Sequence, residues 1–561
     1  MKCPVVRPRW TFVGFALICL AAASLGSASR AEDLLVYGGT IFGARDADSV
    51  LIRDGRIVRV GLQTQLEPLA QPNTRRIDAA GGHVLPGFHD SHLHLLSGGE
   101  SLQQLDLASC QTLADVTRSL SDYAQRNPGR GWVRGRGWQY NLFREGESPS
   151  RKTLDDVVED RPVALVSYDG HSLWCNSRAL ELAEVTESTD DPLGGRIERD
   201  ASSRGPSGAL YERAAALVQR VIPPATRDEK LAALRLAVRH CSTLGLTSVN
   251  DLVHDLETVE LFAELRDRGE LPVRVHVSLP LQGDLTRYVE LRDRYQSDEI
   301  RFVFLKDFVD GVIESKTAYM LAPYENSTEV GKPLLGVDRL TQLVRDARRA
   351  RFAVGVHAIG DGAVRLSLDA FERAGPSEPG TAPPRIEHVE TLSPADVSRF
   401  AKLGVVASMM PIHANPGAEP PETGTWSRNL GRARVHDSFP WRTLREAGAT
   451  LAFGSDWPVM TADPLAGVAV AVTRQDEQGR PAGGWNAHQC LTADEAVEAY
   501  TAGSASAIGR EKDLGRIAPG YLADLVILSP SVDWKRPVTL WSGERVRTVI
   551  MAGKVRGQAA R

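Results

Sequence analysis

Residues 84–94 read Val-Leu-Pro-Gly-Phe-His-Asp-Ser-His-Leu-His, a short apolar run that a Pro-Gly step breaks before the histidines His92 and His94. Because side chains alternate across a strand, residues two positions apart project from the same face. Two imidazoles on one face supply half of a typical metal site. A His-x-His pair alone is a weak indication, since a polar strand end has the same pattern.

Four later apolar runs also end in residues with the chemistry of a metal site. They close with Lys306, His357, His388 and Asp456. In a parallel barrel the carboxyl ends of all strands meet on one face, where active sites lie. The ends of these runs are therefore expected to converge.

The middle of the chain alternates apolar runs with helical patterns, which predicts an α/β fold, a (β/α)8 barrel of the TIM type. An open doubly wound sheet is the alternative. No glycine-rich phosphate loop follows the first run, so nucleotide binding is not indicated. The expected strands are 84–88, 246–250, 273–279, 301–306, 352–357, 385–388, 405–409 and 451–453.

The interval of about 98–240, between the first and second expected strands, is too long for one crossover helix and predicts an inserted subdomain. Loops after barrel strands form the active-site face, so the insertion is expected to cover the pocket. Within it, Trp138, His171 and Trp174 are candidate substrate contacts. Aromatic packing inside the insertion is the alternative role for these side chains.

Both ends of the chain carry short strand patterns. Residues 34–61 contain an Asp-Gly hairpin signal between apolar runs, and residues 515–555 alternate in a similar way. Each end alone has too few strands for independent stability. The two ends are therefore expected to form one β-rich unit.

Length and charge narrow the classes of function. The chain has 561 residues, more than one ordinary domain, and its net charge of −5 gives no reason to expect a nucleic-acid partner. A chain of this size does not need disulfides to stabilise its core, so mostly buried or free thiols are expected beyond the leader. Those cysteines, whose disulfide status the sequence leaves open, are Cys110, Cys175, Cys241 and Cys490.

Residues 1–31 have the plan of a secretory signal peptide. Lys2, Arg7 and Arg9 precede an apolar run over 11–20, and small residues follow it. The run is short for a membrane span of about 20 residues, so no stable membrane anchor is expected after processing. The sequence therefore predicts a periplasmic or secreted protein.

Several phrases of the sequence resemble motifs of the metal-dependent amidohydrolase superfamily, in particular its N-substituted formamide deformylase-like branch, amidohydrolase family 3. The resemblance implies a barrel over 87–507 with the insertion inside it, and a small β-sandwich built from 32–86 and 508–561. The matching phrases are 85–94, 167–172, 357–361, 385–388 and 454–458.

The resemblance also implies a ligand set. His92, His94 and Asp456 would hold one divalent ion, and His357 and His388 would hold a second. Imidazole and carboxylate ligands suit one or two zinc ions, while manganese, iron and cobalt remain alternatives.

Lys306 needs a modification to join this set, because an ammonium group cannot bind a cation. The resemblance implies that Lys306 carries carbon dioxide as N6-carboxylysine, a carbamate that bridges two ions. The alternative is an unmodified Lys306 in an ion pair with Asp307 or Asp310.

Other residues have expected roles around the metal. Asp456 is the expected general base and acid, which accepts a proton from the activated water and returns it to the leaving nitrogen. Asp90 is expected to orient a ligand imidazole, and Asp361 to do the same or to cap the following helix. Trp457 is expected to line the pocket. Two further histidines near strand ends have no clear expected role, and they are His89 and His413.

These observations favour an exported metal-dependent hydrolase acting on a carbon–nitrogen bond of a small molecule, whether an amide, an N-substituted formamide or a cyclic amide. A lactone or ester hydrolase is the nearest alternative. A catalytically silent metal- or ligand-binding protein is another, and a proton carrier at Asp456 argues against it. The sequence leaves open the exact substrate, the metal and its number, and whether the chain forms a homo-oligomer.

Overall fold

The computed structural model describes residues 32–129, 131–143, 148–167, 170, 172–192, 195–200, 203–418 and 420–558. The expected leader at 1–31 and the candidate substrate contact His171 lie outside these ranges. Within them, no helix combines the length and the apolar character that a membrane crossing requires.

An eight-stranded parallel sheet forms the centre of the molecule, and its strands follow one another in chain order. The first and last strands meet through the backbone, because Asp456 N–H donates to His92 O at 2.7 Å and His94 N–H donates to Trp457 O at 2.8 Å. The expected α/β barrel is thereby confirmed, and an open doubly wound sheet is wrong. The strands are β7 (Phe88–Leu93), β14 (Leu246–Leu252), β15 (Arg274–Pro280), β16 (Ile300–Phe308), β17 (Ala353–Ala358), β18 (Arg385–His388), β19 (Val406–Met409) and β20 (Leu451–Phe453).

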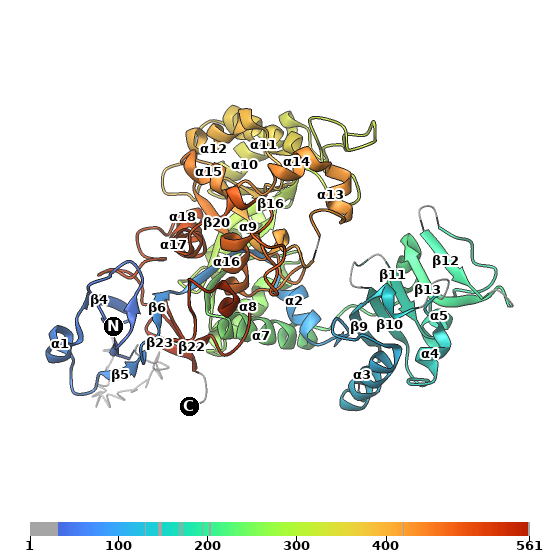
Figure 1. The fold of residues 1–561 in the computed structure, drawn as a ribbon, viewed down its shortest axis with the longest axis horizontal. Helices are drawn as coiled ribbons and strands as arrows, with labels where there is room; N and C mark the ends of the chain where they lie inside the picture. The colour runs from blue at the N-terminus through green and yellow to red at the C-terminus, as the bar shows by residue number, and fades with distance from the viewer. Residues whose placement is uncertain are drawn as a thin grey trace, which may run out of the picture.

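Helices between the strands cover the outside of the barrel, as Figure 1 shows. In α10 (Val337–Arg349), the buried residues Leu340, Leu343, Val344 and Ala347 follow the spacing i, i+3, i+4, i+7 and therefore share one face of the helix. Other covering helices are α7 (Arg227–Thr243), α8 (Glu257–Asp267), α9 (Leu285–Tyr295), α11 (Asp361–Ala374), α12 (Val397–Leu403), α15 (Trp441–Glu446) and α16 (Pro464–Thr473).

The run expected as the first barrel strand, 84–88, instead divides between two sheets. β6 (His83–Pro86) pairs with a C-terminal strand, and β7 begins only at Phe88. At the step between them, Gly87 N–H donates to Asp524 O at 2.8 Å. A Cβ on Gly87 would lie 2.2 Å from Thr247 Oγ1, so only glycine fits where the chain enters the barrel.

Strands from both ends of the chain build a second unit of two sheets, ordered β4-β3-β1-β5 and β2-β6-β21-β22-β23. Side chains from both sheets, such as Leu34 and Ile527, share one apolar core. The buried guanidinium of Arg274 on β15 binds the Asp524 carboxylate at 2.7 and 3.1 Å and ties this unit to the barrel. The strands are β1 (Leu34–Tyr37), β2 (Thr40–Ile41), β3 (Ser49–Arg53), β4 (Arg56–Gly61), β5 (Arg75–Asp78), β21 (Leu525–Leu528), β22 (Val546–Met551) and β23 (Lys554–Gln558).

The insertion forms a lobe of its own that extends from the barrel beyond α2 (Leu95–Leu102) (Figure 1). Its six-stranded sheet has the order β12-β13-β11-β10-β9-β8. The helix α7 begins inside the expected interval of 98–240 but packs on α2. The strands of the lobe are β8 (Leu105–Asp106), β9 (Val133–Trp138), β10 (Val163–Ser167), β11 (Ser172–Cys175), β12 (Gly195–Arg199) and β13 (Pro206–Glu212).

Candidate metal centre

Strand ends of the barrel bring the predicted ligands together in a buried cluster. The rings of His92 and His388 have centroids 5.1 Å apart, and those of His357 and His388 are 4.4 Å apart. The Lys306 side chain, at the end of β16, is only 7% exposed. Residues that are widely separated in sequence therefore share one end of the barrel, as expected for the carboxyl ends of its strands.

Asp456 lies between the two histidines of the His-x-His pair. Its Oδ1 is 3.1 Å from His94 Nε2 and 3.3 Å from His92 Nε2. Burial alone would raise the pKa of Asp456, but the charge of His92 and the hydrogen bonds from both rings hold that pKa well below its usual range. The carboxylate is therefore ionised at neutral pH.

The backbone is strained at two of the site residues. His388 has a φ of 75° and Asp456 has a φ of 58°, in the left-handed region that side chains rarely adopt. Such conformations persist only where the surrounding structure enforces them, and they cluster at functional sites. The chain thus turns sharply at both residues as it leaves β18 and β20.

Glu387, which the sequence analysis did not single out, holds the ring of His92. Its Oε2 lies 3.0 Å from His92 Nδ1. Arg385 Nε lies 2.5 Å from Glu387 Oε1. Burial would raise the pKa of Glu387, yet Arg385 and His92 lower it to about 2. With Nδ1 held by a carboxylate, Nε2, which faces Asp456, is the nitrogen of His92 that can bind a metal.

The order of residues in β18 could have revealed this arrangement. Arg385 and Glu387 are two apart on a strand and so share a face, while His388 follows at the end of the strand. The pattern does not show which imidazole the Glu387 carboxylate contacts. That imidazole belongs to His92, on β7.

Lys306 has an unusual environment for a lysine. Its Nζ is buried without a hydrogen-bond partner among the described residues, and it lies 4.5 Å from the ring centroid of Phe308. Burial lowers the pKa of Lys306 to about 8. The two carboxylates that were the alternative ion-pair partners of Lys306 have other contacts. Asp307 accepts a hydrogen bond from Gln282, and Asp310 accepts three from backbone N–H groups.

At this end of the barrel, two groups of side chains have the donor atoms that a divalent ion needs. One consists of His92, His94 and Asp456, and the other of His388, His413 and Asp456. Within each group the ligand atoms lie within 4.8 Å of one another. His388 Nδ1 and His413 Nε2 are buried without hydrogen-bond partners in the described part of the chain, as is Lys306 Nζ. Buried donor atoms without partners fit an ion at this place, because such atoms are normally satisfied.

The second group contains His413, whereas the resemblance implied His357 beside His388. His357 Nε2 is within 3.1 Å of the Gly311 carbonyl oxygen and 3.8 Å from Asp310 Oδ1. Its ring still lies next to that of His388. His89, the other histidine without a clear expected role, stacks on His276 at 5.1 Å and is not in either ligand group.

Among the described residues, the hydrogen bonds of Asp90 go to backbone and hydroxyl groups, whereas the sequence predicted an imidazole partner. It accepts hydrogen bonds from the backbone N–H groups of His92 and Ser455 and from Ser455 Oγ, at 3.0, 3.1 and 2.5 Å. It thus joins β7 to the segment after β20. Asp361 is the first residue of α11 and accepts a hydrogen bond from Leu321 N–H.

The three tryptophans proposed as pocket residues are all buried. Trp138 and Trp174 lie in the core of the insertion lobe, and their Nε1 atoms donate to Leu165 O and Ser150 O. Trp138 and Trp174 therefore have the alternative role given above, aromatic packing inside the insertion. Trp457 packs on α2, where a Cβ on Gly98 would lie 2.0 Å from its ring.

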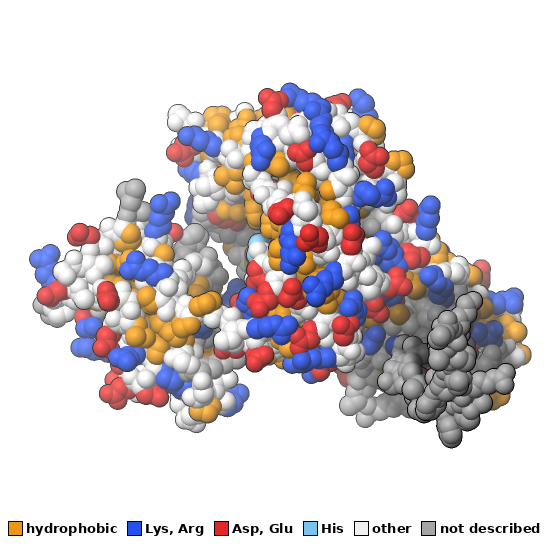
Figure 2. All heavy atoms as spheres, turned by 180° about the vertical axis from the view of Figure 1, so that it is seen from behind, with side chains coloured by type: hydrophobic (Ala, Val, Ile, Leu, Met, Phe, Trp, Pro, Cys, Tyr) orange, Lys and Arg blue, Asp and Glu red, His pale blue; other side chains and the backbone are white. Residues whose placement is uncertain are grey.

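The insertion lobe nevertheless borders the site. Arg136 on β9 donates to Pro458 O at 3.3 Å, two residues after Asp456. Figure 2 shows a hollow between this lobe and the barrel. A cavity of about 130 Å³ adjoins His94, and its lining includes His254, whose ring stacks on that of His94 at 5.4 Å.

Comparison with known proteins places this architecture in a family. The sequence model of the Amidohydrolase family matches residues 75–556. The N-substituted formamide deformylase of Arthrobacter pascens is 28% identical over 538 residues, 92% of this chain and 96% of that protein. Protein LONG AFTER FAR-RED 3 of Arabidopsis thaliana is 32% identical over 519 residues, 89% of this chain and 87% of its own. A crystal structure of an uncharacterized metal-dependent hydrolase from Pyrococcus furiosus has a TM-score of 0.71 and 25% identity, covering 89% of this chain and 99% of that chain.

The matched residues run from β5 into β23 and so include the barrel, the insertion lobe and every candidate ligand. The relatives are covered over almost their whole length. The chain therefore belongs to the amidohydrolase family and is a metal-dependent hydrolase.

Proposed function

We propose that this protein hydrolyses a carbon–nitrogen bond in a small amide, N-substituted formamide or cyclic amide. The observation that carries the proposal is the convergence of His92, His94, His388 and Asp456 at one end of the barrel, with Lys306 beside them. The name of the Arthrobacter pascens relative supports this class of bond.

The residues present fit one or two divalent ions, and we propose zinc. The two ligand groups share Asp456 and offer imidazole and carboxylate donors, which suit zinc. A bound ion supplies Lewis acidity, which polarises a carbonyl group and makes a water molecule acidic.

Asp456 is the group that moves the proton. Its carboxylate is ionised at neutral pH, because the imidazoles at 3.1 and 3.3 Å stabilise the anion. It accepts the proton of the attacking water on a carboxylate oxygen and delivers it to the leaving nitrogen. Glu387 keeps the ring of His92 in the orientation that this exchange requires.

Lys306 is proposed to carry carbon dioxide as N6-carboxylysine. Addition of carbon dioxide needs a neutral amine, and burial makes that form accessible. The product is an anion that can bind a metal, whereas an ammonium group cannot. Lys306→Ala should lower the metal content, and a short carboxylic acid in the buffer should partly restore turnover. Density for a plain amine in a metal-loaded crystal would contradict the modification.

A substrate panel tests the function. Purified protein should hydrolyse members of a set of amides, N-substituted formamides and cyclic amides, and a chelator should abolish turnover. Turnover of lactones or esters alone would assign the site to carbon–oxygen bonds. Metal binding without turnover of any member would indicate a silent binding protein.

Export is a separate proposal, supported by the leader pattern of residues 1–31. Fractionation of cells that express the full chain should recover the protein, shortened by the leader, outside the cytoplasm. Retention of full-length protein in the cytoplasm would contradict it.

A further inference from the structure

A third group of side chains that could hold a metal ion lies away from the candidate metal centre. It consists of His436, Asp437 and His488, whose ligand atoms lie within 4.8 Å of one another. The rings of His436 and His488 stack with centroids 4.3 Å apart, and His436 Nδ1 lies 2.8 Å from Asp437 Oδ1. His436 ends the helix α14 (Arg432–His436), and His488 lies in a short turn over 487–489.

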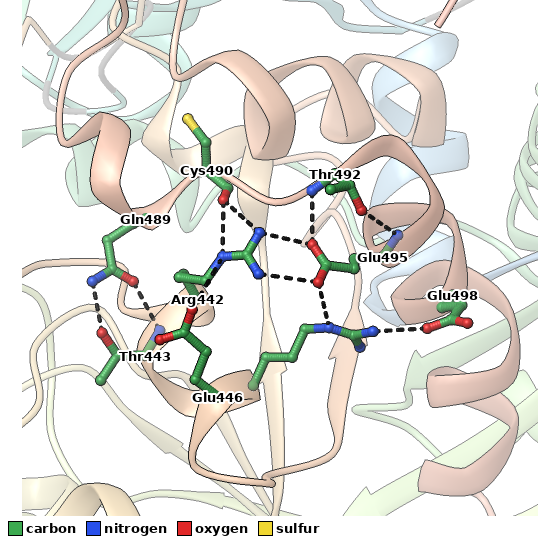
Figure 3. A network of polar contacts seen from close by, with 9 residues as sticks. Arg442, Thr443, Glu446, Gln489, Cys490, Thr492, Glu495 and Glu498 are labelled. Atoms are coloured by element: carbon green, nitrogen blue, oxygen red, sulfur yellow. Dashed lines mark hydrogen bonds and ion pairs between the residues drawn. The ribbon is translucent and has the colours of Figure 1, made fainter.

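Hydrogen bonds on both sides of His488 fix its loop to the neighbouring helices. Before it, Asn486 Nδ2 donates to Val435 O at 2.5 Å. After it, Gln489 exchanges two hydrogen bonds with Thr443, of 3.2 and 2.7 Å, which Figure 3 shows. The backbone segments that carry the two imidazoles are therefore held next to each other by contacts other than those of the rings.

Arg442 anchors the same loop one residue further on. Its guanidinium donates to the carbonyl oxygen of Cys490 at 3.1 and 3.0 Å and also binds Glu495 (Figure 3). The loop over 486–490 is thus tied to α15 as well as to α14. Because the backbone is already anchored, only side-chain rotations are lost when an ion binds, which favours binding.

The donor set selects the class of ion. Two imidazoles and one carboxylate suit zinc and similar transition metals, whereas magnesium and calcium prefer oxygen ligands alone. The side chains of His436 and Asp437 are 67% and 74% exposed, so rotation about their side-chain bonds can bring the donor atoms onto one ion. Solvent can supply the remaining ligand.

We propose that His436, Asp437 and His488 form a second, surface site for zinc or a similar divalent transition metal, which links α14 to the loop over 486–490. This proposal is independent of the proposed function. The site contains none of the residues placed in the catalytic machinery.

The test counts zinc in the full chain after its catalytic centre has been loaded. Wild-type protein and the His436→Ala/His488→Ala variant are dialysed against the same free zinc concentration, and bound metal is measured by plasma emission spectroscopy. Wild type should hold one more zinc per chain than the variant. Added zinc should raise the thermal unfolding midpoint of wild type and not that of the variant, while both turn over substrate at the same rate.

A matched control is Glu446→Gln, which alters an exposed carboxylate on α15 and should bind zinc as wild type does. Equal zinc content and equal midpoint shifts in wild type and the double variant would overturn the proposal. A loss of zinc in the control equal to that in the double variant would overturn it too. Turnover is measured separately. A wild-type protein that is inactive but still binds the extra zinc would support this site and contradict only the proposed function.

Discussion

Asp456 combines two roles that one substitution can separate. An asparagine can still offer an oxygen to a metal but cannot accept a proton, so Asp456→Asn should retain metal while turnover falls by a factor of roughly 100 to 10000. The measurement is turnover at saturating zinc across about pH 5 to 9, where the acidic limb of the profile should also change. Rates within a few-fold of wild type would remove Asp456 as the proton carrier.

Glu387 acts through His92, and its effect should therefore appear in metal affinity. Glu387→Gln removes the charge that faces His92 Nδ1 at 3.0 Å and leaves buried Arg385 without its ion pair. Loss of such a supporting carboxylate should weaken metal binding by about 10- to 100-fold. Competition with a chelator of known affinity measures this. Asp361→Asn is the control, because that carboxylate accepts the Leu321 N–H, and an equal loss in both variants would contradict the assignment.

At the scale of elements, Glu495 joins α15 to the start of α17 (Ala493–Glu498). Its carboxylate accepts hydrogen bonds from Arg442, Arg445 and Thr492 N–H, at distances of 2.8 to 3.1 Å (Figure 3). Burial would raise the pKa of Glu495, but these donors lower it to about 2 from the ordinary 4.5. Glu495→Gln should lower the free energy of unfolding by about 1 kcal/mol at neutral pH.

The sign of this pH dependence follows from the lowered pKa. The stabilisation is fully present above pH 4.5, the pKa in the unfolded chain, and is lost as the pH falls toward 2. The difference between wild type and Glu495→Gln in urea unfolding should therefore shrink over that window. Glu498→Gln, which removes one contact to Arg445, should have a smaller effect. A difference that stays constant down to pH 2 would rule out the charge as its source.

At the scale of the whole molecule, a buried ion pair connects the two-sheet unit built from both chain ends to the barrel. Arg274 and Asp524 have side chains that are 1% and 4% exposed. Removal of one partner leaves a buried charge unpaired, so Asp524→Ala should lower the free energy of unfolding by about 3 to 5 kcal/mol. Denaturant unfolding measures this, with Asp298→Ala, whose side chain is 70% exposed, as the control. Similar small losses in both variants would contradict a coupling of the two units through this pair.

A larger deletion tests the same dependence. A chain ending at residue 510 lacks β21, the strand that pairs with β6, as well as Asp524. It should unfold at a lower temperature, and the strands of 34–61 should become sensitive to proteolysis. Retention of full stability and protection would show that the N-terminal strands do not need the C-terminal ones.

The barrel could be predicted from sequence because each strand is a short apolar run between helical patterns. The convergence of the candidate ligands could be predicted because they lie at the ends of those runs. The division of the first run at Pro86-Gly87 could not be predicted, because the apolar residues continue across it. Only the contacts of Gly87 show that the chain passes there from one sheet to the other. Glu387 was missed because a strand pattern gives the face of a side chain and not its partner on another strand. Trp138 and Trp174 were ambiguous because aromatic rings serve a core and a pocket equally well.

The backbone hydrogen bonds between β7 and the segment after β20 determine when the metal centre can exist. His94 and Asp456 are 362 positions apart in the chain. Until synthesis has passed residue 456, the nascent protein has the His-x-His pair without its carboxylate, and two imidazoles alone hold an ion weakly. Loading with metal therefore has to follow closure of the barrel. If the leader directs export, the ion comes from the compartment in which the chain finishes folding, and the supply there decides which metal the enzyme carries. Refolding of the denatured protein in different single-metal buffers should show this directly, as the bound ion should match the one present while the barrel closes.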